Sequence, residues 1–481
     1  MRNALSILLV SAGVLGLTGS AFPATNGLDA TFGSHGLVAL GPTPTSAIAI
    51  SRLRAIAVQA NGRILIGGNG FDPSDPSGLG NVPLVGRLKD DGSWDTTFGD
   101  HGAFALPYGS ASAPAGGEIH EIVVLSDNSI VAAGGTYSGG VDFNTCTLLL
   151  KLTDVGALDS SFGPGQDGSY CFDFAPDTNH YLLPFHHEGL LRAADDSLYL
   201  TTPYTNLTHG AVAHLDSNGA PISGYGSNGI AALPEHVVAT RVQLTADNKV
   251  LTMGGIDNAA AIAVVRLDDT GQVDNPYGSG GMIAFDAQPG GLVSPSRALL
   301  DAQQRLVIAD NDENGGDMLY YRFARLTIGG ALDTSFNGSS QQPGFPGLAA
   351  PPVTSGDYFD GLTAAIPLAD GHILGVGDAG FAADGDGATN LALLRLSDDS
   401  SYDASFGDAA HPGWASLNIG SGVNGFTRVR VTASDVGGHA FVAIEANDGN
   451  LHGCIGIVRL IPDRLFENRF DAPPATPACP Q

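Results

Sequence analysis

Oxygen-bearing side chains crowd residues 310–315, which read Asp-Asn-Asp-Glu-Asn-Gly. Asp310, Asp312 and Asn314 alternate as the first oxygen ligands of a calcium-binding loop do. The twelfth position of such a loop is Tyr321 instead of a glutamate, so the segment is not a standard EF-hand loop. We expect it in a long loop between two strands, where it could hold calcium. The competing interpretation is an acidic turn without a metal, because matches this short often occur by chance.

The other candidate metal-binding segments are weaker, and no catalytic motif is present. His186, His187 and Glu188 are consecutive, but neighbours in a strand point to opposite faces, so two adjacent histidines would rarely share one ion. Residues 384–387 repeat the acidic pattern in a shorter form. The chain has no GxSxG, HExxH, P-loop or dinucleotide fingerprint. We therefore assign no catalytic residue.

Seven polar residues recur at one position of an internal repeat. Each stands six residues before a short turn, and the residue two positions later is mostly apolar. If this segment is the innermost strand of each repeat, the polar side chains form a ring at the mouth of a central channel. The seven predicted ligand-binding residues are Arg54, His120, Glu188, Thr240, Ser296, Thr363 and Arg430.

Arginines gather near this predicted ring. Arg52, Arg241, Arg297 and Arg428 lie within two residues of it. Focused positive charge at a channel mouth would attract a carboxylate, a phosphate or an acidic glycan. The alternative is a solvated rim, in which each arginine answers a neighbouring acid.

A repeat that could position these residues is most regular at a Leu-Asp-x-x-Phe-Gly segment, which begins at Leu28 and recurs at intervals of 52 to 70 residues. Three more strand-like segments stand between copies and are joined by short Asn/Asp/Gly turns, as at residues 55–59, 63–67 and 83–88. Four antiparallel strands per repeat make a propeller blade. We predict an all-β fold, a single seven-bladed β-propeller of four-stranded antiparallel blades over residues 22–460.

Turn lengths set the order of strands within a blade. Residues 55–59 are expected innermost, two further strands follow, and the Leu-Asp-x-x-Phe-Gly segment is expected as the outer strand. The short turns then lie on one face of the disc. The long, variable loops lie on the other face, where a ligand would bind.

A charge pattern supports the outer hairpin. In six repeats a basic residue of the third strand is followed eight positions later by an acid, and the remaining repeat has His214 and Ile222 instead. We predict cross-strand ion pairs that fix the register, each worth under about 1 kcal/mol if exposed. The pairs are Arg87–Asp95, Lys151–Asp159, Arg266–Asp274, Arg325–Asp333, Arg395–Asp403 and Arg459–Glu467.

The G-x-LDxxFG-x-x-G segment, the D/N-G-x-I-hydrophobic hairpin and the RL-x-x-x-G segment together resemble the bacterial delta-60 repeat family. The resemblance covers nearly all of the chain from Asn26 to Leu460, with repeats four and five the poorest matches. It implies a propeller-like repeat structure and brings no established activity.

Two segments compete to close the ring. Repeat seven ends on its third strand at Leu460, and residues 28–33 could supply the missing strand. Residues 466–471 resemble the same segment. We expect the N-terminal segment to close the propeller.

The four cysteines follow the repeat frame. Cys146 and Cys454 each stand six residues before the leucine that ends the third strand, and another cysteine follows each of them 25 residues later. The matching frames predict disulfides Cys146–Cys171 and Cys454–Cys479, each contributing about 2–4 kcal/mol. The second would hold the Pro-rich tail of residues 461–481.

The N-terminal sequence indicates export, and the net charge restricts the class of partner. Arg2 precedes an apolar run and a small-residue cleavage site, so residues 1–21 read as a signal peptide, with cleavage after Ala24 as the alternative. The mature protein is expected to be secreted (periplasmic, extracellular or cell-surface associated), monomeric, and without a transmembrane segment. A net charge of −28 argues against nucleic acid and anionic membranes as partners.

Two functions remain open at this point. The first is a non-catalytic binding or scaffold protein for an unknown extracellular ligand, a glycan or a protein. The second is an extracellular propeller enzyme, a glycan hydrolase or lyase, with its site on the long-loop face. Carboxylates or histidines that converge at the channel mouth would favour the enzyme.

Overall fold

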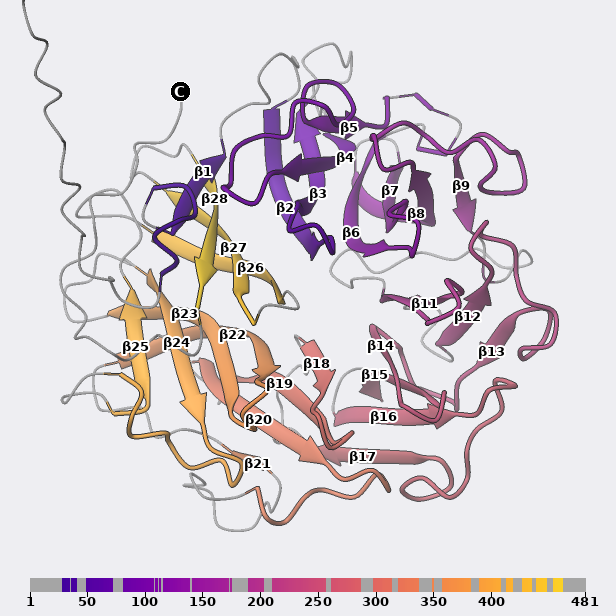
Figure 1. Cartoon of the computed structure of the whole chain (residues 1–481). Helices are drawn as coiled ribbons and strands as arrows, with labels where there is room; N and C mark the ends of the chain where they lie inside the picture. Colours follow the sequence, from indigo (N-terminus) through magenta and orange to yellow (C-terminus); the bar gives the residue numbers. More distant parts are fainter. Residues whose placement is uncertain are drawn as a thin grey trace, which may run out of the picture.

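A computed structural model describes most of the repeat region. The described residues are 28–34, 36–40, 49–71, 81–107, 109–110, 112–113, 116–138, 141–172, 174, 189–202, 210–256, 261–286, 297–313, 319–336, 348–349, 357–381, 389–407, 412–417, 426–434, 438–447 and 453–461. In this part of the chain every regular element is a β-strand. Seven four-stranded antiparallel blades form a seven-bladed β-propeller (Figure 1), as the repeats predict.

The first four blades each use four consecutive strands, which run in chain order from the innermost outward. Blade 1 is β2 (Ala49–Val58), β3 (Ile64–Phe71), β4 (Asn81–Leu88) and β5 (Ala103–Ala105). Blade 2 is β6 (Gly117–Val124), β7 (Ile130–Ser138), β8 (Val141–Leu152) and β9 (Ser169–Phe172). Blade 3 is β10 (Leu190–Arg192), β11 (Leu198–Thr202), β12 (Ala211–Leu215) and β13 (Ile230–Ala232). Blade 4 is β14 (Arg241–Leu244), β15 (Val250–Ile256), β16 (Ala261–Leu267) and β17 (Met282–Asp286).

The last three blades complete the circle. Blade 5 is β18 (Arg297–Leu300), β19 (Leu306–Glu313), β20 (Leu319–Leu326) and β21 (Leu348–Ala349). Blade 6 is β22 (Asp357–Pro367), β23 (Ile373–Phe381), β24 (Thr389–Leu396) and β25 (Trp414–Leu417). Blade 7 is β26 (Phe426–Ser434), β27 (Ala440–Asn447), β28 (Gly453–Leu460) and, from the other end of the chain, β1 (Leu37–Leu40).

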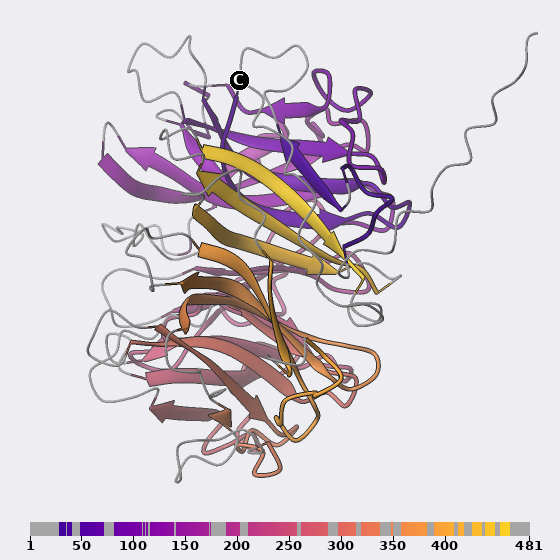
Figure 2. The same ribbon diagram turned by 90° about the vertical axis from the view of Figure 1, so that its left-hand side faces the viewer.

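The hydrophobic core lies between the blades. Each cluster of buried side chains draws on adjacent blades: Ile66 of blade 1 packs with Phe441 of blade 7, and Val85 of blade 1 packs with Leu150 of blade 2. Seen from the side, the yellow strands of blade 7 lie beside the indigo strands of blade 1 (Figure 2). No described helix is long and apolar enough to cross a membrane.

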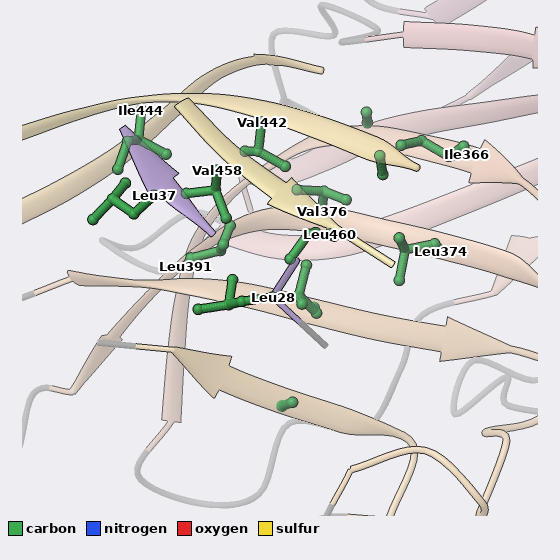
Figure 3. Packing of buried hydrophobic residues seen from close by; sticks show 14 of the residues in the cluster. Leu28, Leu37, Ile366, Leu374, Val376, Leu391, Val442, Ile444, Val458 and Leu460 are labelled. Carbon is green, nitrogen blue, oxygen red and sulfur yellow. The ribbon is translucent and has the colours of Figure 1, made fainter. Parts of the chain in front are cut away.

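The N-terminal segment closes the propeller, as predicted. β1 pairs antiparallel with β28 from Leu37↔Val458 to Leu40↔Ile455, and Leu28 bridges Leu460. Figure 3 shows Leu28 and Leu37 among the buried side chains of blades 6 and 7. The competing segment, residues 466–471, lies outside the described residues.

The prediction that Leu-Asp-x-x-Phe-Gly forms the outer strand is wrong, because the segment is a turn. In blade 1 the Asp95 carboxylate accepts a hydrogen bond from the Thr97 amide at 3.2 Å, and the Phe98 amide donates to the Asp95 carbonyl. Such side-chain acceptors favour turns over strands. Gly99 has φ +52, and a Cβ there would lie 2.3 Å from a backbone oxygen, so the turn needs glycine. The outer strand follows the turn, at β5.

The predicted cross-strand ion pairs form in five repeats. Nitrogen–oxygen distances are 2.9 Å for Arg87–Asp95, 3.2 Å for Lys151–Asp159, 2.8 Å for both Arg266–Asp274 and Arg325–Asp333, and 3.3 Å for Arg395–Asp403. Most of the basic residues are buried instead of exposed: Arg87 is 2% exposed and Arg325 is fully buried. Buried pairs depend on both partners far more than exposed pairs do.

Arg459 has an acidic partner that the sequence pattern did not predict, and the predicted pair with Glu467 stays a prediction. Its guanidinium lies 2.7 Å from the carboxylate of Asp29, and Glu467 lies outside the described residues. Asp29 occupies the repeat's acid position because the N-terminal segment completes blade 7. The closure of the ring therefore decides this pairing.

The short turns of neighbouring blades are tied together. Arg87 extends past Asp95 to the Asp154 carboxylate in the turn of blade 2, at 3.0 Å. Arg325 reaches Asp398 at 2.8 Å, and Arg459 reaches Asp90 at 2.7 Å. One arginine thus links three segments, two within its own blade and one in the next. On the short-turn face these bonds join blade 5 to blade 6, and they link blades 7, 1 and 2 in series.

Candidate functional site

The predicted ring residues occupy irregular positions of the innermost strands. The pairing register shifts between Leu53 and Ala55 in β2 and between Ile119 and Glu121 in β6, which leaves Arg54 and His120 as extra residues of β-bulges. Shifts at the matching positions of β22 and β26 leave Thr363 and Arg430. β-Bulges re-aim side chains and are common next to functional sites. In these four blades the predicted ring residue is therefore the extra residue of a β-bulge.

Thr240 shows a related arrangement in blade 4. Its amide donates to the carbonyl of Met253 at 2.9 Å, and the register pairs Met253 with the next residue, Arg241. Two residues of one strand thus oppose one residue of the other, as in a bulge. Glu188 and Ser296, the ring residues of blades 3 and 5, lie outside the described residues, and only the backbone of Arg430 is described.

Glycines on the second strand accommodate these bulges. A Cβ on Gly68 would lie 1.9 Å from the carbonyl oxygen of Arg52, two residues before the bulged Arg54. A Cβ on Gly134 would lie 1.9 Å from the carbonyl oxygen of Glu118, two residues before His120. The backbones approach so closely that only glycine fits. The bulges therefore depend on residues outside the predicted ring.

Gly134→Ala is expected to lower the free energy of unfolding by about 2 kcal/mol or more, because the added carbon meets fixed backbone. Gly224→Ala is the control, since nothing lies within 4 Å of a Cβ built there. Urea denaturation of both variants measures the difference. Equal stability of the two variants would show that the bulge in β6 does not need its glycine.

A cluster of charged side chains bridges the first two blades where β2 and β6 begin. We call Arg52, Arg54, Glu118 and His120 the mouth cluster. The Glu118 carboxylate lies 2.8 Å from Nε2 of His120, 3.7 Å from Nε of Arg54 and 3.9 Å from Nη1 of Arg52. Both strands are the innermost of their blades and lie nearest the centre of the disc (Figure 1).

The side chains of the mouth cluster differ in how deeply they are buried. The side chain of Glu118 is 8% exposed and that of His120 is 3% exposed, whereas Arg52 is 47% exposed. Burial opposes ionisation of Glu118, but the hydrogen bond with His120 and the attraction of His120, Arg54 and Arg52 outweigh it, and the pKa falls from 4.5 to about 2. Glu118 is therefore an ionised anchor for the two arginines at neutral pH.

The pKa of Glu118 predicts how stability changes with pH. A folded-state pKa below the unfolded value means that the folded protein binds this proton less readily, so the stabilisation is complete above about pH 4.5 and is lost as the pH falls towards 2. Wild type should exceed Glu118→Gln in free energy of unfolding by on the order of 3 kcal/mol at neutral pH. Denaturation at several pH values should show this difference shrink below pH 4.5. A pH-independent difference contradicts the assignment.

Sequence reasoning found Arg54 and His120 but missed Glu118. The sequence did hold a signal for Glu118. It stands two residues before His120 in the second repeat, as Arg52 stands two residues before Arg54 in the first. Arg52 and Arg54 do lie near a neighbouring acid, Glu118, as the solvated-rim alternative requires. However, Arg52 reaches that acid only at 3.9 Å and keeps about half of its side chain exposed, so it stays accessible to a ligand.

The predicted calcium segment is not a loop where it is described. Asp310 and Asp312 lie within β19 and pair in register with Arg322 and Tyr320 of β20. A strand lacks the curved backbone with which a calcium loop surrounds its ion, so the expected loop is absent at these two residues, and calcium binding stays a prediction. Asn314 lies outside the described residues, as do residues 186–188 and 384–387. Within the described part of the chain, no three His, Cys, Asp or Glu side chains are grouped to hold a metal ion.

The register brings the first cysteine pair to one face of blade 2. Cys171 of β9 opposes Leu148 of β8, two residues after Cys146. Residues two apart in a strand share a face, so the two cysteines are diagonal neighbours. The side chains of Cys146 and Cys454 and all of Cys479 lie outside the described set, so both disulfides stay predictions.

Comparisons with known proteins identify no relative of this chain. No family model matches the chain, and no curated protein does. Solved structures with a similar chain path include a protein from Lactobacillus plantarum (11% identity, 77% of this chain and 85% of that chain, TM-score 0.42). An exo-β-1,3-galactanase from Phanerochaete chrysosporium matches at 10% identity over 90% and 97%, with a TM-score of 0.36. Regucalcin, a calcium-binding protein from Agrobacterium tumefaciens, matches at 12% over 68% and 81%, with a TM-score of 0.33. These likenesses are too weak to transfer an activity, and the resemblance to delta-60 repeats stays a prediction.

Proposed function

We propose that this protein is an exported, non-catalytic binding propeller that holds an acidic glycan at the channel mouth. The observation that carries the proposal is the mouth cluster, in which the buried Glu118 carboxylate lies 3.7 Å from Arg54 and 3.9 Å from half-exposed Arg52 on a bulged strand. An arginine pre-positioned by a buried anchor loses less freedom on binding than a free surface side chain does. A carboxylate or sulfate is the group that its guanidinium recognises best.

Charge supports an acidic ligand over a neutral one. Two guanidiniums against one carboxylate give the mouth cluster a formal net positive charge, in a chain of net charge −28. A local positive site on an acidic protein concentrates anions at one place. The backbones of Arg428 and Arg430 lie in β26, next to β2, so further arginines belong to the same part of the ring.

A glycan hydrolase or lyase fits the mouth cluster less well. Glycoside hydrolysis uses two carboxyl groups, one of which must be protonated near neutral pH to donate a proton. Glu118 has a pKa of about 2 and is ionised at that pH. Within the described residues its partners in the mouth cluster are a histidine and two arginines.

Calorimetric titration with a galacturonate trimer tests the proposal, and its neutral methyl ester is the control ligand. We expect the acid to bind, its affinity to fall with added salt, and Arg52→Gln to weaken it about tenfold. Arg192→Gln, an inner-strand arginine near the short-turn end of blade 3, should bind as wild type. Failure of a panel of acidic oligosaccharides to bind, or equal binding to Arg52→Gln, would refute the proposal, and cleavage of the trimer would favour the enzyme.

A further inference from the structure

A cavity lies on the opposite, short-turn face, between blades 4 and 5. It has a volume of about 180 Å³. Arg266 and the ring of Tyr277 contribute from blade 4, and Leu306 and Ile328 contribute from blade 5. Its residues are not part of the mouth cluster.

Arg266 lacks one partner that the equivalent arginine has in three other blades. In blades 1, 5 and 7 the equivalent arginine bonds a carboxylate in the next blade's turn, through Asp154, Asp398 and Asp90. Each aspartate stands two residues after the leucine that ends the third strand, and in blade 5 that position is Ile328.

The rest of the arginine's geometry is kept in blade 4. Arg266 pairs with Asp274 at 2.8 Å, and its Nη1 donates to the carbonyl oxygen of Ile328 at 2.9 Å. Arg459 makes the same backbone bond to Asp90 in addition to its carboxylate bond. Blade 4 therefore has the site of the repeat without the carboxylate that other blades place there.

The Ile328 side chain does not fill this position. It is 60% exposed, one of few large apolar side chains so exposed in the described part of the chain. Beside it, Leu251, Leu306 and the Tyr277 ring give the cavity apolar walls, and the Arg266 guanidinium lies 4.6 Å from the centre of that ring.

We propose that this cavity binds a small monocarboxylic acid with an apolar body, whose carboxylate takes the place of the missing aspartate. The carboxylate bonds Arg266, as Asp398 bonds Arg325, and the apolar body packs on Leu251 and Leu306. A cavity of about 150 Å³ holds a benzene ring, so a body of that size fits. Benzoate is the matching probe.

One acid of the cavity opposes this ligand. Asp247 lines it, and its carboxylate accepts a hydrogen bond from the Thr245 hydroxyl at 2.5 Å. Like charges repel, so Asp247→Asn should tighten benzoate binding. Arg266 and Lys249 both lie close enough to attract Asp247, and they partly offset its charge.

Titration of the full chain with benzoate tests the proposal, with benzamide as a neutral ligand of the same shape. We expect benzoate to bind with a Kd of about 1 mM, and benzamide at least about tenfold more weakly. Ile328→Asp restores the aspartate of the other blades, so it should abolish binding while leaving the melting temperature equal or higher. Val155→Asp is the matched control, because Val155 is a 61% exposed apolar residue of the corresponding turn of blade 2.

Two results would overturn the proposal. One is the absence of benzoate binding to wild type up to about 20 mM, well above the expected Kd. The other is unchanged binding to a folded Ile328→Asp variant. Both are independent of the mouth cluster, because no residue of this cavity belongs to it, and a galacturonate titration leaves these outcomes unaffected.

Discussion

Deletion of residues 22–40 is expected to unfold the protein or drive it into aggregates. The deletion removes four buried side chains, Leu28, Phe32, Leu37 and Leu40, each worth about 1.5–3 kcal/mol of burial, against a typical total stability of 5–15 kcal/mol. It also exposes the hydrogen-bonding edge of β28, which invites strand pairing with another chain. Size-exclusion chromatography and thermal melting measure both effects.

Two further variants make the truncation interpretable. Deletion of residues 22–26 alone removes none of the described contacts, so this variant should melt as the undeleted chain does. Phe32→Ala in the full chain should cost about 3–5 kcal/mol, because Phe32 is fully buried against Phe441 and lies 4.8 Å from the Arg459 guanidinium. A truncated protein that stays monomeric with an unchanged melting temperature contradicts closure by the N-terminal segment.

Arg325→Met is expected to lower the free energy of unfolding by about 3 kcal/mol. The variant leaves Asp333, which is 8% exposed, without its 2.8 Å partner, and removes one of the two arginine partners of Asp398 in the next blade, the other being Arg305. Arg305 lies 3.7 Å from Asp333, so some pairing remains and the effect falls at the lower end of the range for broken buried pairs. Urea denaturation gives the value.

A double variant separates the lost pair from lost packing. Blade 3 has His214 and Ile222 at the two positions and keeps the backbone bond between them at 2.9 Å, so the turn forms without an acid. Arg325→Met with Asp333→Ile should therefore recover much of the loss. Arg192→Ala, which removes a partly exposed pair with Asp196, should cost under about 1 kcal/mol. If Arg325→Met costs no more than this control, the buried arginines do not stabilise the blades.

The number of blades and closure by the N-terminal region were predictable because turn spacing and hairpin signals are local, but the closing strand is β1 and not the predicted residues 28–33. The Leu-Asp-x-x-Phe-Gly segment looked like a strand because its leucine and phenylalanine are apolar. Asp95 and Gly99 make it a turn instead. The side chain of Phe98, which belongs to this turn, is buried in the core. A side chain that bonds its own backbone outweighs strand propensity in this segment.

The mouth cluster could be predicted only in part. The position of Arg54 and His120 followed from the spacing to the turns, but a bulge adds a residue without changing the strand's composition. Adjacent glycines such as Gly67 and Gly68 in the second strand were the signal that could have revealed it. The partner of Arg459 was missed because Asp29 comes from the opposite end of the chain.

A crystal structure of the protein with the galacturonate trimer tests the central claim most directly. We predict that a sugar carboxylate lies within hydrogen-bonding distance of Arg52 or Arg54, at the start of β2 and β6. A trimer bound elsewhere with the mouth cluster empty would contradict the claim that this cluster is the ligand site.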